Sequence, residues 1–304
     1  MKLPLFLALF LLAFTFPASA RTWKQAASGK AIEADLIKVE DGKVHLKLPD
    51  GRTGLVEVLS LSLDDQEYLA GIEKSGAKGG NQWPAFRGPN HDGISPDTGL
   101  LSTWPKEGPN QLWVYGEAGM GYSGFSIVDG HLYTMGSRGE DLTVVCVDVS
   151  NGNEVWAQGI GKDDSEGYNA GWGNGPRSTP TYSDGHVYAI GPKGTVACLD
   201  AASGKEVWKK NLITDFKGTP GGWGFAESPL VDGAHLILAP GGQEAGMVAL
   251  DKKSGDVVWS ATDLKPGKAE YASIIPTEIN GIKQYVKLFE KELVGIAADD
   301  GRIV

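Results

Sequence analysis

Four loops beyond residue 120 combine an aromatic side chain with small neighbours, and two of them also hold the charged residues Arg177 and Glu227. Each loop precedes a run of residues typical of a strand. Flat aromatic faces with one cation and one anion suit a planar, carbohydrate or peptide ligand. We expect Arg177 and Glu227 to pair or to hold opposite ends of a polar ligand. The predicted binding residues are Tyr122, Ser123, Trp172, Asn174, Arg177, Trp223, Glu227 and Tyr271. The alternative is that the aromatic side chains only pack against neighbouring structure.

Two other patterns resemble functional motifs without their structural context. The glycines of residues 119–124 match the dinucleotide fingerprint, but a strand rather than a helix is expected at residues 125–128. Pyrophosphate binding at a helix N-terminus therefore has no basis here. His131, His186 and His235 each follow a turn at the same point of a repeat. We interpret them as repeat residues, and we predict no catalytic residues and no metal site.

The elements that must position these loops form a repeat. The pattern D-x-x-x-G-x-x-x-W occurs three times, and Asp-Gly or Asn-Gly pairs at residues 129–130, 184–185, 232–233 and 280–281 mark further turns. We expect the Asp to bond the turn backbone, the Gly to be left-handed and the Trp to dock on the next repeat. The residues of the three copies are Asp148, Gly152, Trp156, Asp200, Gly204, Trp208, Asp251, Gly255 and Trp259.

One complete repeat extends from Pro180 to Trp208, where three turns separate four strand-like runs. Four antiparallel strands in roughly 50 residues, repeated radially, predict a propeller blade. The aromatic loops would then gather at the mouth of the central channel. About four blades are visible, and an open arc leaves exposed edges. We therefore predict an all-β, partial β-propeller that is truncated; a closed four-blade ring is the alternative.

The cysteines, Cys146 and Cys198, are one repeat apart. Equivalent positions on neighbouring repeats normally exceed the Cα–Cα limit of about 7 Å for a disulfide. We predict buried free thiols.

The repeat resembles the pyrroloquinoline-quinone-type propeller repeat, in which a strand, an Asp-Gly turn and a second strand precede A-L-D-x-x-x-G-x-x-x-W. The segment from Trp83 to Ser95, with Trp104-Pro105 and Leu112-Trp113, resembles the start of exported propellers of planctomycete-type bacteria. The resemblance covers residues 83–304 and implies truncation from seven or eight blades, the number with which relatives of this repeat close. It implies the fold more than the function, because its relatives include an outer-membrane-assembly propeller and quinoprotein dehydrogenases.

Residues 21–72 predict a separate small β module. Three alternating runs separated by Asp-Gly turns predict strands, and Ser62 is placed to cap a short helix. The runs are residues 31–39, 43–48 and 53–58. An initial R-x-W, the two turns and an L-S-x-x-D-Q run resemble the Sla-type homology domain, an SH3-like barrel. That resemblance implies binding of peptides or adaptor proteins. Residues 73–82 have the composition of a linker.

Residues 1–20 have the form of a cleavable export signal. A basic start precedes an apolar stretch too short to span a bilayer, and Ala18-Ser19-Ala20 supplies a cleavage site. Arg21, not Cys, follows, so a lipoprotein is not expected. We predict a periplasmic or secreted protein with no membrane span after cleavage.

The balance of 28 basic and 38 acidic residues, a formal net charge of −10, argues against a nucleic-acid partner. We predict a non-enzymatic scaffold that binds a protein or cell-surface component and needs no cofactor. The alternative is a quinoprotein dehydrogenase of alcohols or sugars. For that alternative the resemblance implies pyrroloquinoline quinone with Ca²⁺, held by clustered oxygen ligands.

Overall fold

The computed structural model describes residues 21–304 except 41, 67–68, 70–81, 96, 98–101, 107, 165 and 172. The chain divides into two compact units, residues 1–79 with 97–102 and residues 80–96 with 103–304. The predicted export signal and most of the predicted linker lie outside the described residues. The expectation of an all-β fold is confirmed, since the described elements are strands with one 3₁₀ turn and a short helical stretch at residues 63–66.

The first unit is one antiparallel sheet whose strands follow one another in chain order. Its buried face carries Trp23, whose indole Nε1 donates to the Ala34 carbonyl at 2.9 Å. Ser62 caps the helical stretch, because its Oγ accepts from the Asp65 backbone N–H at 3.3 Å. The elements are β1 (Arg21–Lys24), β2 (Ala31–Glu40), β3 (Lys43–Lys47), β4 (Thr53–Glu57) and the 3₁₀ turn η1 (Val58–Ser60).

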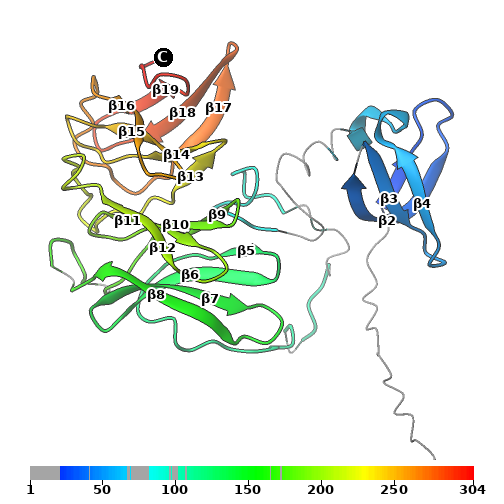
Figure 1. The fold of residues 1–304 in the computed structure, drawn as a ribbon, viewed down its shortest axis with the longest axis horizontal. Helices are drawn as coiled ribbons and strands as arrows, with labels where there is room; N and C mark the ends of the chain where they lie inside the picture. Colours follow the sequence, from blue (N-terminus) through cyan, green and yellow to red (C-terminus); the bar gives the residue numbers. More distant parts are fainter. Residues whose placement is uncertain are drawn as a thin grey trace, which may run out of the picture. The chain divides into compact units, whose positions relative to one another are not determined.

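The second unit consists of consecutive antiparallel sheets that lie side by side (Figure 1). Three sheets have four strands and the fourth has three, which confirms the predicted blades. The first sheet is β5 (Ser126–Val128), β6 (His131–Arg138), β7 (Asp141–Asp148) and β8 (Glu154–Lys162). The second is β9 (Thr181–Ser183), β10 (His186–Ile190), β11 (Thr195–Asp200) and β12 (Glu206–Asn211). The third is β13 (Leu230–Asp232), β14 (His235–Leu238), β15 (Met247–Asp251) and β16 (Val257–Ala261), and the fourth is β17 (Ile275–Ile279), β18 (Ile282–Leu288) and β19 (Leu293–Ala297).

The first hairpin turn of each sheet uses left-handed residues. In the second sheet, Asp184 and Gly185 have φ of 47° and 77°, which matches a two-residue turn that follows the twist of the strands. The third sheet differs from the prediction by one residue, because Asp232 pairs with His235 and the turn starts at Gly233. Asp232 is therefore the last residue of a strand, and its carboxylate is available to the neighbouring sheet.

Each sheet is joined to the next by a tryptophan that covers a glycine. A Cβ on Gly204 would lie 2.6 Å from the Trp156 ring, and that indole Nε1 donates to the Ala201 carbonyl at 3.0 Å. Only glycine, with φ of 73° and no side chain, allows this approach. The same arrangement occurs four times, in the pairs Trp113–Gly152, Trp156–Gly204, Trp208–Gly255 and Trp259–Gly301. Trp113, which the sequence analysis did not assign to this series, precedes the first sheet and covers its glycine in the same way.

A lead segment, defined as residues 82–95, runs beside the first strands of the sheets (Figure 1). Trp83 exchanges two backbone hydrogen bonds of 2.8 Å with Ile127 of β5. The Tyr182 N–H of β9 donates to the Pro84 carbonyl at 2.7 Å. The lead segment is therefore fixed to the first and second sheets by its backbone.

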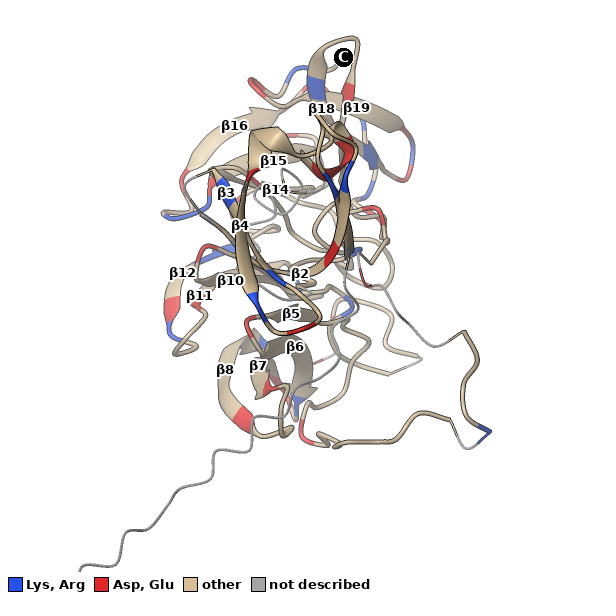
Figure 2. Ribbon diagram, turned by 90° about the vertical axis from the view of Figure 1, so that its right-hand side faces the viewer, with Lys and Arg blue, Asp and Glu red and all other residues tan. Residues whose placement is uncertain are grey.

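Basic and acidic residues are interspersed along the ribbon of the strands and loops (Figure 2). Cys146 and Cys198 are free and buried, which confirms that prediction. No helix among the described residues is both long and apolar enough to cross a membrane.

Candidate functional site

The guanidinium of Arg177 lies among three aromatic rings. Its Cζ is 5.2 Å from the ring centroid of Tyr122, 5.7 Å from that of Tyr168 and 5.9 Å from that of Trp223. These distances allow cation–π attraction, which extends to about 6 Å. The rings come from loops that precede the first strands of the first three sheets. We call Tyr122, Tyr168, Arg177, Trp223 and Tyr271 the aromatic cluster.

Backbone carbonyl groups hold the Arg177 side chain in place. Nη1 donates to the Gly175 carbonyl at 3.0 Å and Nη2 to the Gly173 carbonyl at 3.4 Å. Both glycines have left-handed φ, and a Cβ on Gly175 would lie 2.1 Å from the Met120 carbonyl oxygen. The glycine-rich sequence of this loop therefore allows it to pack closely against the loop that carries Tyr122.

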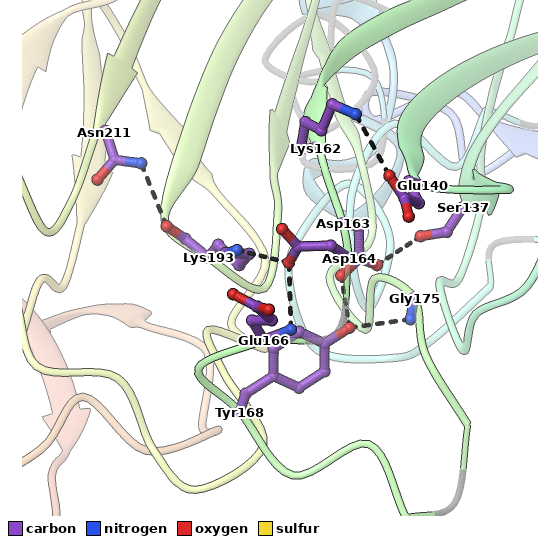
Figure 3. A network of polar contacts seen from close by, with 10 residues as sticks. All are labelled: Ser137, Glu140, Lys162, Asp163, Asp164, Glu166, Tyr168, Gly175, Lys193 and Asn211. Atoms are coloured by element: carbon purple, nitrogen blue, oxygen red, sulfur yellow. Dashed lines mark hydrogen bonds and ion pairs between the residues drawn. The ribbon is translucent and has the colours of Figure 1, made fainter.

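The hydroxyl of Tyr168 is anchored by a buried carboxylate (Figure 3). Its hydroxyl donates to Asp163 Oδ1 at 2.6 Å, and Ser137 Oγ donates to the other oxygen of that carboxylate. Burial and the bond to Asp163 raise the pKa of Tyr168 to about 12, so the phenol stays neutral. Tyr168 was not among the predicted binding residues, although it is an aromatic residue in the same Gly-rich loop as Arg177.

The loop is also tied to the second sheet (Figure 3). Lys193 Nζ lies 2.6 Å from Asp164 Oδ1, and the Lys193 carbonyl accepts from Asn211 Nδ2 at 3.2 Å. These contacts restrict the loop, so the aromatic cluster is held before any ligand binds.

Trp223 and Tyr271 extend the cluster toward the fourth sheet. Their ring centroids lie 5.9 Å apart, and the Trp223 backbone N–H donates to the Tyr271 hydroxyl at 3.3 Å. Tyr122 is 54% exposed, Trp223 43% and Tyr271 40%. Large aromatic side chains that remain this exposed and close together form a surface suited to binding.

The other predicted site residues have different surroundings. Ser123 donates from Oγ to the Ser178 carbonyl at 2.6 Å, so it joins the first two sheets. Asn174 is half-buried between the two glycines that hold Arg177. Trp172 lies outside the described residues.

Glu227 does not contact Arg177, which corrects the predicted pairing. Its side chain is 1% exposed, and its Oε2 lies 3.1 Å from Nζ of Lys287, which is 0% exposed. Glu227 Oε1 accepts from the Ala239 N–H at 2.7 Å. A carboxylate removed from water needs a cation and hydrogen bonds, and Lys287 of β18 supplies the cation. Glu227 therefore joins the third and fourth sheets and lies beneath the surface.

Lys287 was also missed by the sequence analysis. It follows Val286 and precedes Leu288 near the end of β18. A lysine between two apolar residues of a strand is a weak signal of a buried ionic contact, and it does not say which acidic residue is the partner.

Among the described residues, no group of three or more His, Cys, Asp or Glu side chains comes together.

The repeat also identifies the family. The profile described as outer membrane protein assembly factor BamB matches residues 110–304, more than half of the chain. The chain belongs to this family. The profile of SLA1 homology domain 1 matches residues 14–76, so both resemblances noted in the sequence are confirmed.

Individual relatives of this BamB-family chain fall into two groups. It is 30% identical over 137 residues to quinohemoprotein alcohol dehydrogenase of Comamonas testosteroni, covering 44% of this chain and 18% of that protein. It is 29% identical over 130 residues to BamB of Yersinia pestis, covering 41% of this chain and 28% of that protein. The chain thus spans less than a third of the length of either relative.

Solved structures give matches of the same two kinds. BamB from Moraxella catarrhalis has a TM-score of 0.42 at 19% identity, covering 63% of this chain and 51% of that chain. The quinohemoprotein alcohol dehydrogenase of Comamonas testosteroni has a TM-score of 0.44 at 15% identity, covering 76% of this chain and 50% of that chain.

Proposed function

We propose that this BamB-family chain is an exported scaffold that binds other proteins, and that the aromatic cluster is a contact surface for a partner. The observation that carries the proposal is the gathering of three half-exposed aromatic rings and one arginine from loops of successive sheets. Tyr, Trp and Arg are the residues most enriched where binding energy concentrates in protein interfaces.

The rigidity of the cluster supports this role. Arg177 is held by two carbonyl groups and Tyr168 by Asp163, so little side-chain freedom would be lost on binding. The BamB relatives carry a name that places them in outer membrane protein assembly. A partner of this chain in the cell envelope is consistent with that name and with the predicted export signal.

The contact surface is tested by site-specific photocrosslinking in cells that export the full chain. A benzophenone amino acid at position 223 is expected to give a discrete protein adduct, which Arg177→Ala weakens strongly. The matched control is position 155 on β8, where Val155 is 45% exposed. Absence of an adduct at position 223, or the same adducts at both positions, would contradict the proposal.

Export is tested separately by sequencing the N-terminus of the mature chain. Cleavage after Ala20 predicts a mature protein that begins at Arg21. An intact N-terminus on cytoplasmic protein would exclude a role in the cell envelope.

The alternative, a quinoprotein dehydrogenase, is favoured by the 30% identity to the Comamonas testosteroni enzyme. It predicts that pyrroloquinoline quinone with Ca²⁺ quenches tryptophan fluorescence in a saturable way and supports dye-linked alcohol oxidation. Both results together would replace the scaffold proposal with an enzymatic one.

A further inference from the structure

A cavity of about 190 Å³ lies between the lead segment and the starts of β13 and β17. None of its lining residues belongs to the aromatic cluster. Its walls combine apolar side chains with a small number of polar groups. The residues that matter for the argument are Phe86, Arg87, His91, Ser228, Ser273 and Ile274.

Two of the three charged or titratable side chains of the lead segment stand on unusual backbone. Arg87 has φ of 65° and His91 has φ of 57°. Left-handed backbone is uncommon for residues other than glycine, because the Cβ is crowded, and Asn, Asp and His are its most frequent exceptions. Strained residues are frequent at functional sites, so Arg87 and His91 beside a cavity are candidates for contacts with a ligand.

Three polar side chains of the cavity, those of Arg87, Ser228 and Ser273, are able to donate hydrogen bonds to a ligand. Arg87 Nη2 donates to the Asp92 carbonyl at 3.1 Å, and the described residues offer this guanidinium no second acceptor. Ser228 Oγ accepts from the Thr179 N–H at 3.0 Å. Ser273 Oγ accepts from the Ser228 N–H at 3.0 Å. Within the described part of the chain neither serine O–H has an acceptor, so both remain able to donate.

A buried ion pair fixes the two strand starts that carry these serines. Glu227 immediately precedes Ser228, and its carboxylate faces Lys287 at 3.1 Å. Lys287 Nζ also donates at 2.5 Å to the carbonyl of Ala272, the residue before Ser273. The serine positions are therefore held before a ligand arrives.

An exposed arginine and two hydroxyl donors that line a partly apolar cavity call for a ligand with an anionic end and an apolar body. We propose that the cavity binds a small organic carboxylate, with the carboxylate facing Arg87, Ser228 and Ser273 and the apolar body against Phe86 and Ile274. This site is separate from the contact surface of the aromatic cluster, and neither proposal depends on the other.

The first test is calorimetric titration of the purified full chain with benzoate. Benzoate is expected to bind in a saturable way, at least tenfold more tightly than acetate, which lacks the apolar body. Benzyl alcohol, which has the apolar body without the charge, is the second control and is expected not to saturate. Failure of benzoate to bind, or equal binding of benzyl alcohol, would overturn the proposal.

The second test separates ligand binding from folding. Arg87→Asn removes the guanidinium but places a residue that tolerates left-handed backbone, so the variant is expected to melt no lower than the parent. Its benzoate affinity is expected to fall at least tenfold. Arg52→Asn, at an exposed turn of the first unit, is the matched control and is expected to leave affinity unchanged. Unaltered binding by Arg87→Asn would show that the cavity is not the site.

His91 supplies a spectroscopic readout. Burial lowers the pKa of His91, opposed by the Phe86 carbonyl and by the nearby carboxylates of Asp232 and Asp92, and reinforced by Arg87. A bound carboxylate favours the protonated ring, so saturating benzoate is expected to raise the pKa of His91 in an NMR titration. An unmoved titration curve at saturation would place the bound benzoate outside the cavity.

Discussion

Lys287 Nζ lies 3.1 Å from Glu227 Oε2, and both side chains are essentially removed from solvent. The pair crosses the boundary between the third and fourth sheets. Burial raises the pKa of Glu227, although Lys287 and the Ala239 N–H oppose that rise.

Removal of one partner is therefore expected to be more damaging than removal of both. Lys287→Met leaves Glu227 buried without a cation and is expected to lower the free energy of unfolding by about 3–5 kcal/mol. The double variant Glu227→Gln with Lys287→Met is expected to recover part of that loss. Urea denaturation followed by circular dichroism measures both. A double variant less stable than Lys287→Met would contradict the pairing.

The tryptophan–glycine contacts are expected to carry much of the stability between sheets. Trp208→Ala removes a ring that covers Gly255 and an indole bond of 3.0 Å to the Lys252 carbonyl. The expected loss is about 3–5 kcal/mol of unfolding free energy. Trp104→Ala is the control, because Trp104 is 64% exposed. Equal melting temperatures for the two variants would show that Trp208 does not join the sheets.

The contacts of Asp232 in the third sheet predict that the stability of the protein depends on pH. Burial alone would raise the pKa of Asp232, but hydrogen bonds from Lys283 Nζ and the Tyr285 hydroxyl, each 2.7 Å long, lower it overall. A carboxyl whose pKa is lower in the folded state stabilises the protein above the pKa of the unfolded state. That stability is lost as the pH falls through the folded pKa.

At about pH 7, Asp232→Asn is therefore expected to unfold at a lower midpoint urea concentration than the parent. The difference between the two midpoints is expected to shrink toward about pH 3. Asp129→Asn is the control, since the Asp129 carboxylate accepts from the Gln82 amide rather than from a cation. A difference for Asp232→Asn that is constant over this range would argue against the ionic contact.

The two thiols are expected to be unreactive in the folded protein. Burial raises the pKa of Cys146 to about 12 and that of Cys198 to about 11, and the thiolate is the reactive form. A thiol-specific chromogenic reagent is expected to label neither cysteine in native protein and both in urea. Rapid native labelling would show that the sheets open locally around these residues.

The first unit is expected to fold without the propeller. Its core cluster consists of residues from that unit alone, with Trp23, Val44, Leu46 and Leu61 almost fully buried. A fragment of residues 21–74 is expected to show dispersed amide shifts. Random-coil shifts would mean that the fragment depends on the rest of the chain.

Local patterns were sufficient to predict the architecture. The Asp-Gly turn at residues 184–185 and the D-x-x-x-G-x-x-x-W repeat each determine the conformation of a turn between two strands. That conformation depends on residues close together in the sequence, so the sequence pattern is enough to predict it. The loops that carry Tyr122, Arg177 and Trp223 were also apparent from the sequence, because each precedes a predicted strand at the same point of the repeat.

Only the tertiary structure decided how side chains of different sheets pair. Glu227 contacts Lys287 rather than Arg177, and the buried Asp163 holds Tyr168 of the aromatic cluster in place. Asp232, the last residue of β13, accepts hydrogen bonds from a lysine and a tyrosine of β18. Such contacts depend on strand register and on the distance between sheets. A shift of one residue in the register of a strand changes which side chain a charged residue contacts. The spacing of residues along the chain does not determine those quantities.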